Sequence, residues 1–292
     1  MSESSQHLFS DRVDLMDNPK ANRVGFVSRL ARRQTRQKYG LALVEGPQAV
    51  RELIRFQPSA IRDLYVDLEM ASGTYRELVL AAREVTDFVH PCTRQVVDHM
   101  SSDAQGIVAV AELEKLPFHP VEQLQLDAGM AVLLARVQDP GNAGTMVRLA
   151  DAFGAQAVLA SAGTADLSSP KVLRSAVGSS FHLPTYTGQF SDLVVPLKKA
   201  GFKILGTSGE GAISFDDLID AATLGTDPEL APVLEGPLVW VFGNEAKGLA
   251  PDEAELCDYL VSIPMYGQAE SLNVASAAAV VLSGTARIRH RQ

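Results

Sequence analysis

The sequence predicts an α/β protein of two domains, with a parallel sheet in the second domain. A length of 292 residues, 46% of them hydrophobic, is enough for two cores. Short, continuous apolar runs recur in the second half of the chain, as expected of strands that are buried on both faces of a parallel sheet. Each run stops at a turn and a helical pattern follows, which is the order of elements in an α/β fold.

The cysteines and the start of the chain indicate a reducing compartment. Cys92 and Cys257 are far apart in the sequence and lack the spacing of a metal site, so we expect free thiols, no bound metal and a cytoplasmic location. Residues 1–10 are polar and lack the apolar core of a signal peptide. No apolar run reaches the roughly 18–20 residues of a membrane span, so we expect no membrane contact.

The first domain is predicted over residues 19–113, after a disordered segment at 1–18. Four short β-rich runs alternate there with helical patterns. We expect strands at Leu41–Val44, Ile61–Val66, Asp87–His90 and Ile107–Ala111, with helices at Gln48–Phe56, Tyr75–Arg83 and Thr93–Met100. From residue 114 to 126 the periodicity is lost, and Pro117 and Pro120 interrupt it, so we predict a linker.

One basic segment stands out against a net charge of −9. That net charge alone argues against nucleic acid, since phosphate binding normally needs a surplus of Lys and Arg. From Lys20 to Lys38, however, the chain has seven basic residues and no acidic one. Val24, Val27 and Leu30 or Ala31 recur at helical spacing, so we expect one helix from Asn18 to Lys38 with an apolar stripe. The charged face of such a helix either is simply exposed to solvent or binds a polyanion.

The second domain, predicted over residues 127–292, opens with a buried-strand run at 131–137. The Asp-Pro-Gly turn that follows leads into a helix from about Ala143 to Phe153, with Asn142 placed to cap it. Arg148 lies off the apolar stripe of this helix. Its spacing alone therefore fits a solvated side chain.

The next unit combines hydroxyl groups with positive charge. A strand at 157–160 leads to a helix that begins near Ser168 and carries Lys171 and Arg174. The first turn of this helix could seat a phosphate, or the helix could simply lie at the surface. A further strand is expected at 202–206.

Two strand–loop–helix units close the chain. The runs Leu238–Phe242 and Tyr259–Ile263 are predicted strands, and the helix expected after Pro251 has an acidic first turn that would repel a phosphate. The loop between them matches neither dinucleotide nor P-loop signatures, which disfavours a nucleotide-dependent enzyme. A ligand without phosphate fits better. The last helix, predicted over Ser271–Arg287, has small residues in its middle and should pack closely against its own sheet or a partner subunit.

Three stretches resemble, in order, the three motifs of the SpoU/TrmH family of RNA 2'-O-ribose methyltransferases. They are V-Q-D-P-G-N-A-G-T-M-V-R-L-A-D-A-F-G at 137–154, V-F-G-N-E-A-K-G-L at 241–249 with I-P-M at 263–265, and E-S-L-N-V-A-S-A-A-A at 270–279. The first domain is similar to the substrate-binding domain of many members, with E-G-P at 45–47 and S-D-A-Q-G-I-V-A-V at 102–110. The resemblance implies a small α/β RNA-binding domain followed by a SPOUT domain, which is a parallel α/β domain with a deep trefoil knot.

The resemblance also implies a cofactor, a substrate and an assembly. S-adenosylmethionine would bind in the knot, and the substrate would be a structured RNA, ribosomal RNA in preference to transfer RNA. The catalytic domains would form a homodimer. The positions that match the cofactor site are Gly243, Asn244, Ile263, Met265 and Leu272. The positions that match the catalytic site are Asn142, Arg148, Glu245, Ser271 and Asn273.

We assign RNA binding to basic residues and the central catalytic role to Arg148. The candidate RNA contacts are Arg29, Arg32, Arg33, Arg36, Lys171 and Arg174. A guanidinium is a poor proton acceptor, so we interpret Arg148 as a clamp on the neighbouring phosphate that also stabilises alkoxide charge. Two alternatives remain: a transfer-RNA ribose methyltransferase, and a non-catalytic RNA-binding protein with the same fold. The intact Asn142, Arg148, Glu245 and Asn273 speak against the second alternative.

Overall fold

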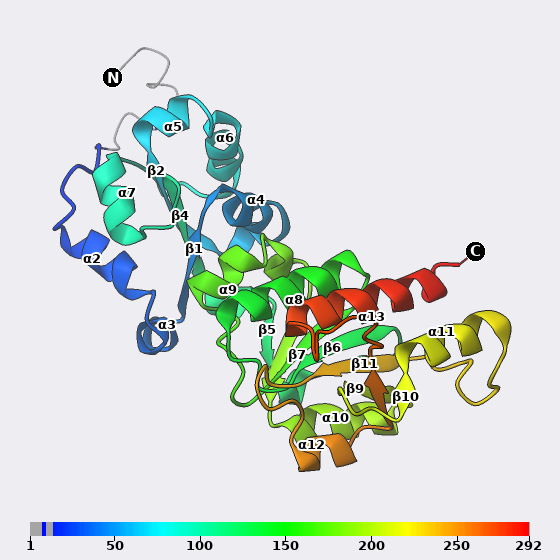
Figure 1. The fold of residues 1–292 in the computed structure, drawn as a ribbon. Helices are drawn as coiled ribbons and strands as arrows, with labels where there is room; N and C mark the ends of the chain where they lie inside the picture. The colour runs from blue at the N-terminus through cyan, green and yellow to red at the C-terminus, as the bar shows by residue number, and fades with distance from the viewer. Residues whose placement is uncertain (1–7, 10–13, 292) are drawn as a thin grey trace. The chain divides into compact units, whose positions relative to one another are not determined.

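The computed structural model describes residues 8–9 and 14–291 (Figure 1). Contacts divide the chain into two compact units, of which unit 1 is Met1–Pro117 with Asp166–His182 and unit 2 is Phe118–Ala165 with Leu183–Gln292. The segment at 166–182 therefore packs with unit 1, although it lies inside the range predicted for the second domain. Most of the disordered segment predicted at 1–18 falls outside the described residues. Within it, Met16 forms a β-bridge with Cys92, so its last residues are fixed to unit 1.

Unit 1 is built on a four-stranded mixed sheet in the order β1–β4–β2–β3. Its strands are β1 (Leu41–Glu45), β2 (Ile61–Asp67), β3 (Val89–Cys92) and β4 (Ile107–Glu112). β4 is antiparallel to both β1 and β2, whereas β2 and β3 are parallel. Its helices are α2 (Asn22–Arg29), α3 (Arg33–Tyr39), α4 (Pro47–Phe56), α5 (Leu68–Ser72), α6 (Arg76–Val85), α7 (Arg94–Met100) and α9 (Pro170–Ser175).

The basic segment forms two helices, α2 and α3, and the single helix predicted there is wrong. Val24, Val27 and Leu30 are buried, as their spacing predicts. The break has a side-chain cause, because the guanidinium of Arg36 donates to the carbonyls of Leu30 at 3.0 Å and Ala31 at 2.8 Å. These carbonyls lie just after the last turn of α2, where no amide of the helix is available to donate a hydrogen bond to them. Arg36 thus caps α2 and fixes the turn into α3.

Unit 2 is built on an eight-stranded sheet in which every pairing is parallel, which confirms the predicted parallel sheet. The strands in spatial order are β10 (Ile213–Ser214), β12 (Tyr259–Ser262), β9 (Lys203–Thr207), β11 (Leu238–Phe242), β6 (Met130–Leu134), β7 (Ala157–Ser161), β8 (Thr185–Gly188) and β5 (Phe118–Pro120). The runs that predicted β6, β7 and β11 are buried at every position. The carboxyl ends of parallel strands meet at one edge, which is where ligands bind in such sheets.

Helices cover both faces of this sheet (Figure 1). They are α8 (Pro140–Ala152), α10 (Phe190–Lys199), α11 (Phe215–Leu224), α12 (Pro251–Glu255) and α13 (Val274–Arg289). α8 and α13 lie against one face, and α10 and α12 against the other. No helix among the described residues is long and apolar enough to cross a membrane.

The small residues of α13 pack within the chain, against α8 and α11. Ala275 and Ala278 are buried, and a Cβ added to Gly284 would lie 2.6 Å from the ring of Phe215 in α11. The close approach expected from the sequence is therefore made to the protein's own helices. A buried hydrogen bond of 3.0 Å from the indole of Trp240 to the hydroxyl of Thr285 ties α13 to β11.

Local backbone chemistry moves two predicted boundaries. β6 ends at Leu134 rather than at residue 137, because Arg136 has a φ of 58° and cannot continue a strand. α8 begins at Pro140, and its N-cap is Asp139, whose carboxylate accepts from the amide of Asn142 at 2.8 Å. Asn142 therefore does not cap the helix as predicted, and its side chain is free for other contacts. β5 lies inside the predicted linker at 114–126 and extends the edge of the sheet.

Candidate active site

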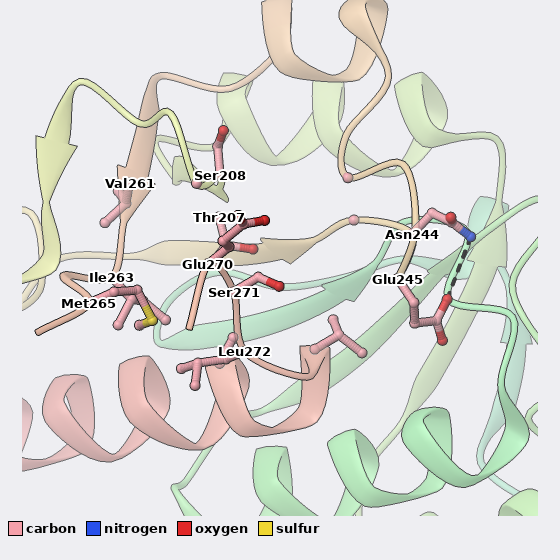
Figure 2. A pocket seen from close by; sticks show the side chains of 15 residues that line it. Thr207, Ser208, Asn244, Glu245, Val261, Ile263, Met265, Glu270, Ser271 and Leu272 are labelled. Carbon is pink, nitrogen blue, oxygen red and sulfur yellow. Dashed lines mark hydrogen bonds between the residues drawn. The ribbon is translucent and has the colours of Figure 1, made fainter. Parts of the chain in front are cut away.

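A pocket lies at the carboxyl edge of the parallel sheet in unit 2 (Figure 2). Its walls come from the ends of β9, β11 and β12 and from the first turn of α13. The lining residues are Thr207, Ser208, Gly209, Gly243, Asn244, Glu245, Gly248, Val261, Ile263, Met265, Glu270, Ser271, Leu272, Val274 and Ala277. The pocket is open to solvent at its mouth, and its empty space is about 750 Å³ when the mouth is included.

All five residues predicted to hold the cofactor line this pocket, together with two of the predicted catalytic residues, Glu245 and Ser271. Figure 2 shows Ile263, Met265 and Leu272 grouped on one side, with Asn244 and Glu245 on the other. The fifteen lining residues include two carboxylates and no lysine or arginine. Apolar groups opposite hydroxyls and carboxylates suit a ligand with an aromatic base and a positive charge and without phosphates, and S-adenosylmethionine is such a ligand.

The sequence reasoning missed the wall that β9 contributes. Thr207, Ser208 and Gly209 follow this strand directly and line the pocket. A signal for them was present in Gly-Thr-Ser-Gly at 206–209, a turn at the end of the strand predicted at 202–206. Since the strands are parallel, this turn had to lie at the same edge as Gly243 and Ile263.

The segment at 243–250, which we name the pocket loop, is shaped by close backbone contacts. A Cβ added to Gly243 would lie 2.4 Å from the carbonyl carbon of Gly248. The backbones of Asn244 and Gly248 exchange hydrogen bonds of 3.0 and 2.8 Å, and Gly248 has a φ of 63°. The Asn244 side-chain oxygen accepts from the amides of Ala246 and Lys247, each at 3.1 Å. The pocket loop thus contains a tight turn from 243 to 248 that requires glycine at both of these positions.

Three predicted catalytic residues form one chain of hydrogen bonds beside the pocket. The amide of Asn273 donates to the Asn142 oxygen, and the amide of Asn142 donates to Glu245, each at 3.2 Å. Asn273 is oriented by its role as N-cap of α13, because its oxygen accepts from the amides of Ala275 at 2.9 Å and Ser276 at 3.4 Å. The order of donation therefore runs from Asn273 through Asn142 to Glu245.

Glu245 is held in its ionised form. Its carboxylate accepts from the backbone amides of Gln138 at 3.2 Å and Asp139 at 3.1 Å, in addition to Asn142. Partial burial alone would raise the pKa of Glu245, but these hydrogen bonds hold it below the ordinary value of 4.5. A carboxylate of this kind orients its neighbours and is a weak base.

Arg148 lies apart from this chain. It is exposed on α8 and does not line the pocket, and its side chain makes no hydrogen bond or ion pair with other described residues. Six residues separate it from Asn142, which is about 9 Å along the helix axis. As the sequence spacing predicts, it lies off the buried stripe of α8. Arg148 is thus available to a ligand that approaches from solvent.

The predicted RNA contacts in the basic segment of unit 1 divide by exposure. Arg29, Arg32 and Arg33 are exposed, and the weak approach of Arg33 to Asp166 at 3.9 Å leaves its side chain 67% exposed. Arg36 is only 2% exposed and forms an ion pair with Asp166. A side chain this deeply buried cannot reach a phosphate, so the prediction for Arg36 is corrected.

The first turn of α9 does not offer the phosphate seat that the sequence suggested. The amide of Val172 in this turn donates to the hydroxyl of Ser169 at 3.4 Å. Just before the helix, the carboxylate of Asp166 accepts from the amide of Ser168 at 3.0 Å and from its hydroxyl at 2.7 Å. Arg174 forms ion pairs with the buried Glu45 and with Asp103, so most of its charge is balanced. Lys171 is exposed. Of the two cations predicted here, Lys171 is the one that solvent-borne phosphate can reach.

A salt bridge that the sequence did not predict lies behind the pocket loop. Glu253, in the first turn of α12, is 4% exposed and accepts two hydrogen bonds from Arg136, at 2.8 and 2.6 Å. It also accepts from the amide of Ala250 at 2.8 Å. Burial alone would raise the pKa of Glu253, but the hydrogen bond and charge of Arg136 and the Ala250 amide hold it below 4.5.

This depressed pKa predicts how unit 2 responds to acid. The folded state binds the Glu253 proton more weakly than the unfolded state, so the stability from this group is complete above pH 4.5 and is lost as the pH falls through the folded value. The free energy of unfolding should therefore decrease below about pH 4.5. Chemical denaturation between pH 3 and pH 7 measures it, and the variant Glu253→Gln should show a flatter profile. An identical slope in this variant would assign the acid response to other carboxylates.

Comparisons with known proteins agree with this site. A model of the SpoU rRNA Methylase family matches residues 129–283. The chain is 31% identical over 275 residues to the 23S rRNA (guanosine(2553)-2'-O)-methyltransferase RlmP of Bacillus subtilis, which covers 91% of this chain and 97% of the relative. It is 30% identical over 265 residues to the 23S rRNA (uridine(2479)-2'-O)-methyltransferase of Streptomyces viridochromogenes, covering 89% and 87%. The crystal structure of an AdoMet-bound rRNA methyltransferase from Sinorhizobium meliloti is similar with a TM-score of 0.77 at 25% identity, covering 94% and 98%.

Proposed function

The chain belongs to the SpoU rRNA methylase family, and we propose that it methylates the 2'-hydroxyl of a ribose in ribosomal RNA with S-adenosylmethionine as donor. The observation that carries the proposal is the hydrogen-bonded chain Asn273–Asn142–Glu245 beside a pocket that has carboxylates and no cationic side chain. Ribosomal RNA is preferred to transfer RNA because both named relatives act on 23S rRNA. One of them modifies a guanosine and the other a uridine, so family membership does not determine which base the target nucleotide carries.

The reaction is an in-line transfer of a methyl group from sulfur to oxygen. When bound, S-adenosylmethionine supplies a methyl carbon on a positively charged sulfur. The ribose 2'-oxygen bonds to this carbon while the carbon–sulfur bond breaks, and the sulfur keeps the electron pair and becomes neutral. A free ribose hydroxyl is a weak acid, so its proton needs an acceptor as the new bond forms. In this proposal the acceptor is the neighbouring phosphate or water.

We assign Asn142 to the orientation of the reacting hydroxyl. Asn273 and Glu245 hold its side chain from both ends, so its position is fixed before the RNA arrives. Glu245 has a depressed pKa and would be a poor proton acceptor, and its role in this proposal is to hold Asn142 and the amides that follow β6. Ser271 lines the pocket, and its hydroxyl would be available to the bound donor.

Arg148 would hold the phosphate next to the target ribose. A guanidinium binds phosphate oxygens with two parallel hydrogen bonds and keeps its charge at any pH of interest. Its exposure and freedom from acidic partners support this assignment. In this position Arg148 would also stabilise negative charge that develops on the 2'-oxygen.

Family membership supports further proposals on architecture. We propose that residues 19–113 recognise the RNA, that 127–292 form the catalytic domain around a deep trefoil knot, and that two catalytic domains form a homodimer. We also propose a cytoplasmic location, which an rRNA substrate supports. These points stay predictions.

Transfer of labelled methyl from S-adenosylmethionine to total RNA tests the proposed function. The product is then mapped by alkaline hydrolysis, which cleaves RNA through its free 2'-hydroxyl and leaves a gap in the ladder at a methylated ribose. A gap in ribosomal RNA is expected. Label without a gap would mean base methylation, and a gap in transfer RNA would establish the alternative substrate. A protein that binds the donor but labels neither free RNA nor ribosomal particles at any stage of assembly would be a non-catalytic RNA binder.

Reversing the charge of Arg32 and Arg33 to glutamate should weaken RNA binding and flatten its salt dependence. The slope of log K against log salt should decrease in magnitude by roughly 1.5, since each phosphate contact contributes about 0.7–0.9. The affinity for S-adenosylmethionine should not change. Filter binding at several salt concentrations measures the slope, with the exposed pair Arg55→Glu and Arg76→Glu as control. An unaltered slope would remove the basic segment from the RNA surface.

A further inference from the structure

The residue after β6 that leads into the first motif has a backbone conformation that favours glycine. Arg136 has a φ of 58°, and its amide donates to the hydroxyls of Ser161 and Thr164, each at 3.1 Å. A residue with a Cβ is strained in this region. Glycine would avoid this backbone strain, so contacts of the arginine side chain must offset it. One of these contacts is made to the pocket loop.

Arg136 fastens the pocket loop at two points, one near its start and one near its end. At its start, the side-chain amide of Asn244 donates to the carbonyl of Arg136 at 3.0 Å. At its end, the guanidinium of Arg136 donates to the carbonyl of Gly248 at 3.2 Å. Glu253, which Arg136 holds, accepts from the amide of Ala250 at 2.8 Å. Asn244 and Gly248 line the pocket, whereas Arg136 does not.

We propose that Arg136 is a positioning residue that keeps the pocket loop in the shape that binds S-adenosylmethionine. The inference rests on the proposed function, since it concerns the same pocket. Glu253 holds the guanidinium in a two-bond pair through Nε and Nη2, which aims the second N–H of Nη2 at the carbonyl of Gly248. Lysine could form one of these bonds but has no planar fork, so it cannot hold Glu253 and Gly248 in the same way.

The double variant Arg136→Gly with Glu253→Gln separates this role from folding. Glycine suits a φ of 58°, and glutamine avoids a buried carboxylate without its partner, so the melting temperature should stay close to that of the wild type. Isothermal titration calorimetry should show a Kd for S-adenosylmethionine that is raised about tenfold. In methyl-transfer assays KM for the donor should rise while kcat changes little. The single variant Arg136→Lys should lie between the wild type and the double variant.

Lys198 offers a matched control at the other end of α12. Its ammonium group donates to the carbonyl of Leu256 at 3.0 Å and pairs with Asp258 at 3.0 Å. Its side chain is 33% exposed, against 28% for Arg136, but it does not contact the pocket loop. Lys198→Gln should therefore leave the Kd for S-adenosylmethionine unchanged.

Three results would overturn the positioning role. One is a folded double variant with the wild-type Kd, and another is an equal rise in Kd for Lys198→Gln. If the double variant does not fold, Arg136→Lys decides the matter, and a wild-type Kd in that variant counts against the role. A wild type that binds S-adenosylmethionine but methylates no RNA would refute the proposed function while the Kd comparison still tests Arg136.

Discussion

Replacing Arg148 by alanine should lower the rate of methyl transfer about 100-fold to 1,000-fold, the usual loss when one group that stabilises developing charge is removed. The affinity for S-adenosylmethionine should stay the same, because Arg148 does not line the pocket. Single-turnover transfer of labelled methyl to the substrate RNA, together with calorimetry for the donor, measures both quantities. The gap that marks the methylated ribose in the alkaline ladder should disappear with the rate.

Two further variants make this result specific to Arg148. Arg148→Lys keeps the positive charge but loses the two-bond grip on phosphate, so it should recover part of the rate. Arg287→Ala removes an arginine that is also exposed on a helix of unit 2, α13, and it should behave as the wild type. A full rate in Arg148→Ala would assign phosphate binding and charge stabilisation to other residues.

The central strands could be predicted because burial on both faces leaves a plain sequence signal. β6 and β11 are continuous apolar runs, and these two strands pair with each other in the sheet. β5, β8 and β10 have two to four residues and mixed polarity, so nothing in the sequence separates them from loops. β5 becomes a strand only through its pairing with β8. Edge strands of this kind depend on partners that periodicity does not identify.

The candidate site divides in the same way between local and long-range causes. Asn142, Glu245 and Asn273 could be named because each lies in a motif that resembles the family pattern. Their hydrogen-bonded order could not, because Asn142 is separated from Asn273 by 131 residues and from Glu245 by 103. Only the parallel sheet brings these loops to one edge. The resemblance identified the residues, and the fold gives them their partners.

Arg36 and Arg136 show how a charge in the sequence can mislead. The basic neighbours of Arg36 predict that it contacts RNA, but its guanidinium pairs with Asp166, 130 residues away. The apolar run at 131–137 predicts that Arg136 belongs to a strand, whereas its left-handed backbone ends the strand and its side chain pairs with Glu253. In both cases a carboxylate that is remote in sequence holds the guanidinium, which is buried in Arg36 and half-buried in Arg136. Local composition therefore predicts the amount of charge but not its exposure.

Gly243→Ala should destabilise unit 2 by about 3 kcal/mol and abolish binding of S-adenosylmethionine. The added Cβ would lie 2.4 Å from the carbonyl carbon of Gly248 and 2.6 Å from the amide nitrogen of Leu249. Both atoms belong to the backbone, so no side-chain rotation relieves the contact, and the pocket loop must open. Thermal unfolding should show a melting temperature lower by about 6–12 °C, and calorimetry should detect no heat of binding.

Gly209→Ala is the matched control, because Gly209 lines the same pocket and a Cβ there meets no atom within 4 Å. Its melting temperature should equal that of the wild type. If Gly243→Ala melts like Gly209→Ala, the turn at the start of the pocket loop tolerates a side chain and its tightness is not what shapes the pocket. If the melting temperature of Gly243→Ala is lower, the close backbone contact between Gly243 and Gly248 supports both the stability of the fold and the site for the methyl donor. The second result is expected, since Gly243 and Gly248, whose backbones approach each other in this turn, both line the pocket.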